Sequence, residues 1–226
     1  MHKYAVIVAG GSGTRMGGGM PKQFRSLCGR PVVWWSMKAF HDEDPTTRII
    51  LVLPEEFISL WKDFHATLPF EDQVPHEITT GGTSRTESVK KGLALVKEEA
   101  LVAIHDGARP LVTPTLISEG WKVAASKGCA VPAVPVTDSL RFLGTGNKNE
   151  SVNRDNYVRV QTPQVFKSSL IKQAYEKAGD KSYSDDGVVM ENAGHIVTLF
   201  AGSPDNIKIT NPKDLAIAQV LMQSDG

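Results

Sequence analysis

Short apolar runs alternate with amphipathic segments along most of the chain. The runs at 4–9, 48–54 and 129–135 are rich in valine and isoleucine, which is typical of strands buried on both faces of a sheet. Between them, the segments 55–65 and 83–98 place apolar residues at helical spacing. This order of strands and helices predicts an α/β fold: a Rossmann-like, mostly parallel sheet with helices on both faces.

Composition limits the classes of protein to which the chain can belong. The chain has 226 residues, of which 41% are hydrophobic, and we expect one domain spanning 1–226. Lysine and arginine together number 25, as do aspartate and glutamate, so there is no global positive field for nucleic acid or an anionic membrane. The two cysteines, Cys28 and Cys129, have neither disulfide-framework nor metal-site spacing. Since no apolar run approaches about 20 residues, we expect a cytoplasmic protein without a membrane span.

Residues 137–160 interrupt the alternation. The sequence "GTGNKN" is a turn signal between two alternating stretches, which predicts a projecting β-hairpin arm. The stem carries Leu140, Phe142, Val152 and Tyr157, which is too much apolar surface to stand alone in water. We therefore expect a partner subunit to bury the arm in a homodimer; the alternative is that the arm folds back on its own domain.

The pattern after the arm predicts five further elements. They are a helix over 167–179, a helix over 184–194 with Ser184 as a possible N-cap, a strand over 195–200, a short strand over 206–210 and a closing helix over 212–223. Within the short strand, Lys208 alternates with Ile207 and Ile209, so its side chain is predicted to point away from the core-facing isoleucines.

A glycine-rich stretch, "GGSGTRMGGGMPK", follows the first predicted strand directly. Glycines expose backbone N–H groups to an anion and let the backbone approach it closely, which is typical of phosphate binding. The stretch is not a P-loop, because Lys22 follows a proline, and it is not the dinucleotide fingerprint, because Met16 stands at the third glycine position. Its two cations, Arg15 and Lys22, suit a triphosphate better than a single phosphate. A flexible surface turn with solvated charges is the alternative.

Polar residues also follow two other predicted strands. The motif "GGTSRTES" begins with Gly81 and Gly82, and "HDGARP" places Asp106 and Arg109 directly after an apolar run. Ligands of open α/β sheets bind outside the carboxyl ends of the strands, so we expect these motifs to meet the glycine stretch. A carboxylate that faces a phosphate loop is a candidate ligand for a divalent ion or a sugar hydroxyl, although a loop-capping role for Asp106 is the alternative.

Six motifs in order resemble one known family. They are "AGGSGTRMGGGMPKQF", "GGTSRTESV", "HDGARP", "VTDSLR", "QTPQVF" and "DNIKIT", and together they resemble the 2-C-methyl-D-erythritol 4-phosphate cytidylyltransferases of the non-mevalonate isoprenoid pathway. The resemblance extends from Val6 to Leu221. It implies a nucleotide-diphospho-sugar transferase type of fold, a single nucleotidyltransferase domain, and an arm at about 137–160 that crosses to the neighbouring subunit of a homodimer. It also implies CTP and a small polyol phosphate as substrates, Mg²⁺ as the cofactor, and pyrophosphate as a product.

The resemblance implies roles for individual residues as well. Arg15 and Lys22 match the cationic pair that holds the triphosphate and stabilises the α-phosphate in the transition state. The positions that would bind CTP are Ala9, Gly10, Gly11, Gly13, Gly82, Thr83, Ser88 and Gly107. The positions on the side of the polyol phosphate are Asp106, Arg109, Ser139, Arg154, Thr162, Ser184 and Lys208, with Asp106 also near the metal. The attacking phosphate oxygen is already ionised, so no protein base is needed and His105 is expected to be structural.

Other functions remain open at the level of sequence. The ribitol 5-phosphate cytidylyltransferases resemble the chain in the same glycine stretch and in "QTPQ". A sugar-phosphate nucleotidyltransferase that uses UTP or GTP fits less well, and an NAD-dependent oxidoreductase fails on the fingerprint. A nucleotide sensor without catalysis is a further alternative, but it would have no need for both Arg15 and Lys22.

Overall fold

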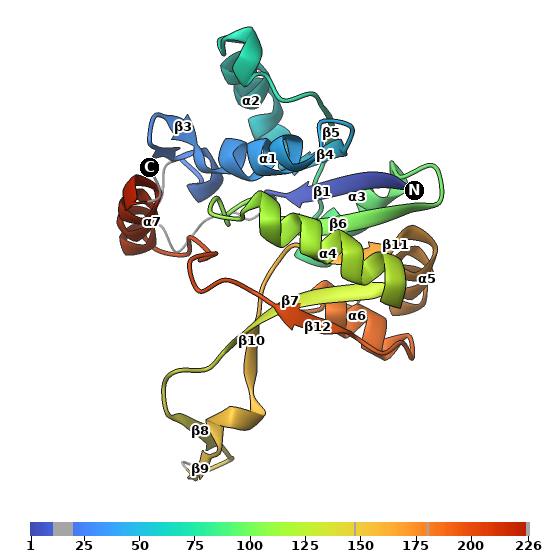
Figure 1. Cartoon of the computed structure of the whole chain (residues 1–226), viewed down its shortest axis with the longest axis vertical. Coiled ribbons are helices and arrows are strands. Elements are labelled where there is room, and N and C mark those ends of the chain that lie inside the picture. Colours follow the sequence, from blue (N-terminus) through green and yellow to red (C-terminus); the bar gives the residue numbers. More distant parts are fainter. Residues whose placement is uncertain (11–19, 147, 180, 225–226) are drawn as a thin grey trace.

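The computed structural model describes residues 1–10, 20–146, 148–179 and 181–224, and these are built around one central sheet (Figure 1). Within the described residues, the strands of this sheet follow the order β10, β7, β11, β6, β1, β4, β5, with β12 also paired to β7. Their bounds are β1 His2–Val8, β4 Arg48–Leu53, β5 His76–Thr80, β6 Ala100–Asp106, β7 Cys129–Pro135, β10 Val158–Val160, β11 Gln164–Lys167 and β12 Leu199–Ala201.

The sheet is mixed but mostly parallel, which confirms the predicted fold class. β1 lies between β6 and β4 and is parallel to both, and β5 extends the parallel part beyond β4. β11 is antiparallel to both β6 and β7. β11 was not predicted, because its four residues are too few to show a strand period, although Val165 and Phe166 are fully buried on opposite faces.

Helices cover both faces of the sheet and bury a separate core on each. The helices are α1 Val32–Glu43, α2 Ile58–Ala66, α3 Arg85–Ala94, α4 Pro114–Lys127, α5 Ser168–Ala178, α6 Asp186–Asn192 and α7 Pro212–Ser224. Along β1, Ala5 and Ile7 pack with residues of α1, α2 and α4, whereas Tyr4 and Val6 pack with residues of α3, α5 and α6. In Figure 1, α4 crosses in front of the sheet. This alternation of side chains in a strand buried on both faces explains the continuous apolar run in the sequence.

Short elements connect the larger ones. They are the strands β2 Ser26–Leu27 and β3 Arg30–Pro31, and the 3-10 turns η2 Lys22–Phe24, η3 Glu55–Phe57, η4 Phe70–Asp72 and η5 Arg154–Asn156. None of the helices in the described part of the chain is long and apolar enough to span a membrane.

The helix starts near the cavity described below are capped by side chains. Ser84 accepts a hydrogen bond from the backbone N–H of Glu87 and begins α3. The prediction that Ser184 caps α6 is wrong. The cap is Asp185, whose carboxylate accepts hydrogen bonds from the N–H groups of both Gly187 and Val188. The hydroxyl of Ser184 instead donates to Asp185 Oδ2, 3.1 Å away.

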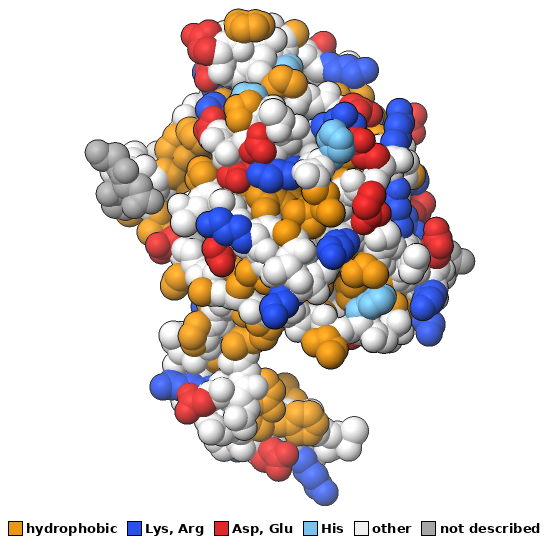
Figure 2. Space-filling model, turned by 45° about the vertical axis from the view of Figure 1, so that its right-hand side comes forward, with side chains coloured by type: hydrophobic (Ala, Val, Ile, Leu, Met, Phe, Trp, Pro, Cys, Tyr) orange, Lys and Arg blue, Asp and Glu red, His pale blue; other side chains and the backbone are white. Residues whose placement is uncertain are grey.

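The hairpin predicted over 137–160 is present but shorter: it covers 140–152, whereas 158–160 are β10 and pair with β7 of the central sheet. β8 Leu140–Leu143 pairs antiparallel with β9 Asn149–Val152, and Leu140 faces Val152. The hairpin projects from the rest of the chain in Figure 1 and carries hydrophobic surface in Figure 2. Phe142 is 58% exposed and Leu143 is 78% exposed, so this apolar surface is not covered by the arm's own domain.

Of the two strands predicted after residue 194, the first is partly right and the second is wrong. The strand expected over 195–200 is β12, which is shorter and begins at Leu199. The segment 206–210 is not a strand, because Ile209 donates one backbone hydrogen bond to Ala108 O (2.8 Å) and forms no ladder. The predicted alternation nevertheless holds, with Ile209 fully buried and Lys208 directed to Asp106.

Candidate active site

A cavity of about 670 Å³ lies at the carboxyl ends of β1, β5 and β6. It brings together eight of the residues that the sequence analysis selected. They are Ala9, Gly10, Lys22, Gly82, Thr83, Ser88, Asp106 and Lys208. Gly107 follows directly, and a Cβ atom there would lie 3.2 Å from Ala9 Cβ, so the chain is tightly packed behind the cavity. Gly11, Gly13 and Arg15 lie outside the described residues.

The end of β1 forms the floor of the cavity at Ala9 and Gly10. The side-chain amide of Gln23 donates to Ala9 O at 2.6 Å, and Gln23 itself is buried. A Cβ atom on Gly10 would lie 3.1 Å from Ser88 Oγ. Gln23, which was not predicted as a site residue, links the segment after the glycine stretch to the strand before it.

The turn between β5 and α3 forms one wall. Ser88 Oγ accepts from the N–H of Gly82 at 3.0 Å and donates to Ser84 O at 2.9 Å. Glu87 accepts from both the N–H and the hydroxyl of Thr83, at 2.8 and 2.9 Å. These bonds fix the turn, and its small residues let a ligand approach the backbone closely.

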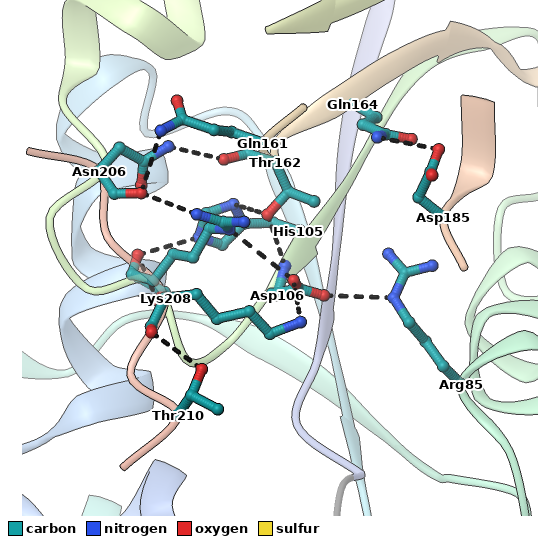
Figure 3. Close-up of polar contacts among 12 residues, drawn as sticks. Arg85, His105, Asp106, Gln161, Thr162, Gln164, Asp185, Asn206, Lys208 and Thr210 are labelled. Atoms are coloured by element: carbon teal, nitrogen blue, oxygen red, sulfur yellow. Dashed lines mark hydrogen bonds and ion pairs between the residues drawn. The ribbon is translucent and has the colours of Figure 1, made fainter. Parts of the chain in front are cut away.

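Asp106, at the end of β6, is the centre of a cationic cluster (Figure 3). Its Oδ1 atom accepts from Arg85 Nε at 3.2 Å, its Oδ2 atom lies 2.7 Å from Lys208 Nζ, and Arg109 Nε is 3.8 Å away. Burial by itself raises the pKa of the Asp106 carboxyl, but the charges of Arg85 and Lys208 outweigh it and hold the pKa well below the usual value. Asp106 is therefore an anion that gathers three cations at the cavity.

Arg85, in the motif "GGTSRTES", was not predicted as a site residue either. Its guanidinium donates from Nη1 and Nη2 to Asp186, at 3.0 and 2.7 Å, and from Nε to Asp106. Burial lowers the pKa of Arg85, but Asp186 and Asp106 outweigh it and raise the pKa well above the usual value. The available signal was position: an arginine in the first turn of a helix opposes the helix dipole and so calls for a compensating anion.

A buried network supports Asp106 from behind. Its N–H donates to Thr162 Oγ1 at 3.0 Å, and His105 Nδ1 lies 3.2 Å from the same oxygen. His105 is fully buried, and burial lowers its pKa to about 4. The imidazole is therefore neutral at pH 7, which suits the structural role expected for it. Arg109 donates to Asn206 O at 2.8 Å and so fastens the segment that carries Lys208.

Three selected residues lie away from this cavity in the single chain. Ser139 and Arg154 belong to the arm, where Arg154 donates to Thr137 O. Ser184 lies before α6 and is bonded to Asp185. The structure of one chain therefore does not bring these residues to Asp106.

A mostly parallel sheet with a cavity at the carboxyl ends of its strands defines the fold and the ligand site of an α/β enzyme. A family model described as 2-C-methyl-D-erythritol 4-phosphate cytidylyltransferase matches residues 3–224. The chain belongs to this family.

Similar proteins agree over the full length. The 2-C-methyl-D-erythritol 4-phosphate cytidylyltransferase of Phocaeicola vulgatus is 43% identical over 222 residues, which cover 98% of this chain and 100% of that protein. The crystal structure of the 2-C-methyl-D-erythritol 4-phosphate cytidylyltransferase from Thermus thermophilus has a TM-score of 0.79 at 29% identity, covering 99% of this chain and 100% of that one. The 4-diphosphocytidyl-2C-methyl-D-erythritol synthase from Anaerococcus prevotii has a TM-score of 0.84 at 26% identity and covers 98% of both chains.

Proposed function

We propose that the chain transfers the cytidylyl group of CTP to 2-C-methyl-D-erythritol 4-phosphate and releases pyrophosphate. One observation carries the proposal besides family membership: the motifs after β1, β5 and β6 line a single cavity together with Lys22 and Lys208. A volume of about 670 Å³ is in the range of small-molecule sites.

The base of CTP would occupy the part of the cavity between Ala9, Gly82 and Ser88. The side chains there are small, and there is little room for larger ones: a Cβ atom added at Gly10 or at Gly81 would lie 3.1 Å from Ser88 Oγ. A pocket this narrow can read a pyrimidine through backbone N–H and C=O groups. Thr83 and Gly107 would be near the ribose.

The reaction would need charge stabilisation rather than a protein base. An ionised oxygen of the substrate phosphate forms a bond to the α-phosphorus of CTP, while the bond from that phosphorus to the oxygen bridging the β-phosphate breaks. Pyrophosphate leaves with the electron pair. Lys22, together with Arg15, would stabilise the negative charge that develops on the α-phosphate oxygens.

The polyol phosphate would bind on the side of Asp106. Lys208 is held at 2.7 Å from that carboxylate while its side chain remains 41% exposed, so it can contact a second anion. Arg109 and Thr162 would act by holding Asp106 and the segment of Lys208 in place.

The residues present fit a magnesium ion that arrives with the nucleotide. Within the described residues, no group of three or more His, Cys, Asp or Glu side chains could hold a metal by itself. Asp106 supplies one carboxylate in the cavity, and Mg²⁺ is usually bound by one or two carboxylates together with substrate phosphates. When bound, the ion would neutralise charge on the phosphate oxygens.

The arm would complete the site in a homodimer. Its exposed Phe142 and Leu143 need cover, and Ser139 and Arg154 do not line the cavity of their own chain. Burial of the arm against a second copy of the chain would cover Phe142 and Leu143. It would also bring Ser139 and Arg154 to the substrate phosphate of the neighbouring subunit. In this proposal the chain is one nucleotidyltransferase domain with the arm as its dimerisation segment.

The test is pyrophosphate release with CTP and Mg²⁺, offering 2-C-methyl-D-erythritol 4-phosphate and ribitol 5-phosphate in parallel. We expect turnover of the first substrate and its loss in Lys22→Ala. Lys62→Ala, which changes a lysine on α2, serves as the control. Turnover of ribitol 5-phosphate alone would overturn the substrate, and binding of CTP without pyrophosphate release would favour a sensor.

A further inference from the structure

Arg85 and the residues behind it form a buried chain of contacts that leads away from the cavity. Asp186 is fully buried and accepts from Arg85 Nη1 and Nη2, at 3.0 and 2.7 Å. Asp186 Oδ1 also accepts from the hydroxyl of Tyr175, at 2.5 Å. Tyr175 is 3% exposed and belongs to the core between the sheet and α5. Arg85 therefore joins Asp106, at the end of β6, to α5 and α6 on one face of the sheet.

We propose that Arg85 is a positioning residue, held by Asp186 and Tyr175, that fixes the orientation of the Asp106 carboxylate toward Lys208. The proposal rests on the proposed function, because it concerns how the same cavity is kept ready for its substrates.

The geometry explains why an arginine is needed at this position. The two terminal nitrogens of the guanidinium form a fork on Asp186, which leaves Nε to donate to Asp106 Oδ1 at 3.2 Å. With Oδ1 held in this way, Oδ2 faces Lys208 Nζ at 2.7 Å. A lysine has one charged nitrogen and no rigid fork, so it cannot hold two carboxylates in fixed directions.

The chain offers a matched control at the opposite end of the sheet. There, Arg48 Nη1 donates to Tyr4 and to Glu98, both at 2.6 Å, and Tyr4 also donates to Glu98 at 3.0 Å. This network likewise contains an arginine, a tyrosine and a carboxylate, but it is at the amino ends of β1 and β4, away from the cavity.

The kinetic experiment compares Asp186→Asn and Tyr175→Phe with Tyr4→Phe. We expect kcat to fall about tenfold in Asp186→Asn, as is typical when the partner of an active-site ligand is removed, with a smaller change in KM for CTP. Tyr175→Phe should lower kcat in the same direction, and Tyr4→Phe should leave it unchanged. Arg85→Lys should lower kcat as well, because lysine keeps the positive charge but cannot contact both carboxylates at once. A purely structural role would lower Tm in all variants and leave kcat per folded molecule unchanged, and that result would overturn the proposal.

A second readout needs no turnover. In a crystal structure of Asp186→Asn, or of the double variant Arg85→Gln with Asp186→Asn if the single variant folds poorly, we expect the Asp106 carboxylate to rotate and its contact with Lys208 to lengthen. An unchanged Asp106 would overturn the inference. If the wild-type protein released no pyrophosphate but Asp106 moved in the variant, the proposed reaction would fail while the positioning role of Arg85 would stand.

Discussion

The ammonium group of Lys208 lies 2.7 Å from the Asp106 carboxylate, although the two residues are 102 positions apart in the chain. Asp106 ends a central strand, and Lys208 stands on a segment that is not part of the sheet. The contact therefore depends on the path of the segment after β12, which Ile209 anchors by its bond to Ala108.

Asp106→Asn should impair both stability and turnover. The substitution removes the anion that Arg85, Lys208 and Arg109 share: the largely buried Arg109 loses its nearby carboxylate, whereas Arg85 keeps Asp186 and Lys208 stays partly in water. Breaking a fully buried pair costs about 3 kcal/mol, and because these cations are only partly buried or paired elsewhere, we expect urea denaturation to report a smaller loss of about 1–2 kcal/mol. Turnover should fall about 100-fold. The control is Asp205→Asn, which changes an exposed aspartate on the segment that carries Lys208. Equal stability and turnover in both variants would contradict the central place of Asp106.

Stability should fall as the pH is lowered through the histidine range, because burial lowers the pKa of both His76 and His105. Trp61 Nε1 donates to His76 Nε2 at 2.8 Å, and Nδ1 bonds to Val74 O, so the imidazole is neutral. Burial lowers the pKa of His76, with His65 close by adding to the effect. A histidine whose pKa is lower in the folded than in the unfolded chain contributes its full stability above the pKa of the unfolded chain, about 6.5. This contribution is lost as the pH falls toward the pKa of the folded chain.

Urea denaturation at pH 8 and pH 5, followed by tryptophan fluorescence, tests this dependence. His76→Gln should lose less stability on acidification than the wild type, and His41→Gln should behave as the wild type. A wild-type stability that is the same at both pH values would contradict the prediction.

Gly92→Ala should destabilise the chain even though alanine favours helices. A Cβ atom there would lie 2.4 Å from Val6 Cγ1 and 3.1 Å from Val52 Cγ2, in the core between α3 and the sheet. Overpacking of this kind costs about 1–3 kcal/mol, against a gain of about 1 kcal/mol from helix propensity. Thermal denaturation should show a lower Tm. Gly120→Ala on α4 is the graded comparison, since its nearest contact would be 3.0 Å and its loss should be smaller.

The arm should control the oligomeric state. Phe142→Ser with Leu143→Ser removes apolar surface that is exposed in the single chain, so the fold should survive while association weakens. Sedimentation velocity should show a dimer for the wild type and a monomer for the variant. Phe70→Ser, an exposed aromatic residue away from the arm, should remain dimeric. A wild-type monomer at micromolar concentration would contradict the prediction.

Much of the fold could be predicted from local pattern. The parallel strands β1, β4 and β6 carry long β-branched runs, and the helices that follow them show helical spacing, because each element reports its own burial. The hairpin was visible in its turn residues. β11 was not visible, since its strand character comes from pairing with β6 and β7 rather than from its own four residues.

The amino-acid sequence by itself determined the fold class, the arm, and the motifs that meet at the carboxyl ends of the strands, because periodicity and glycine placement are local properties of the chain. Only the tertiary structure decided that Arg85 and Lys208 share Asp106 and that Asp186 holds Arg85 from behind. An ion pair depends on which residues the sheet order and the loop paths bring within a few ångströms, and charge alone does not say which partner a buried side chain will find.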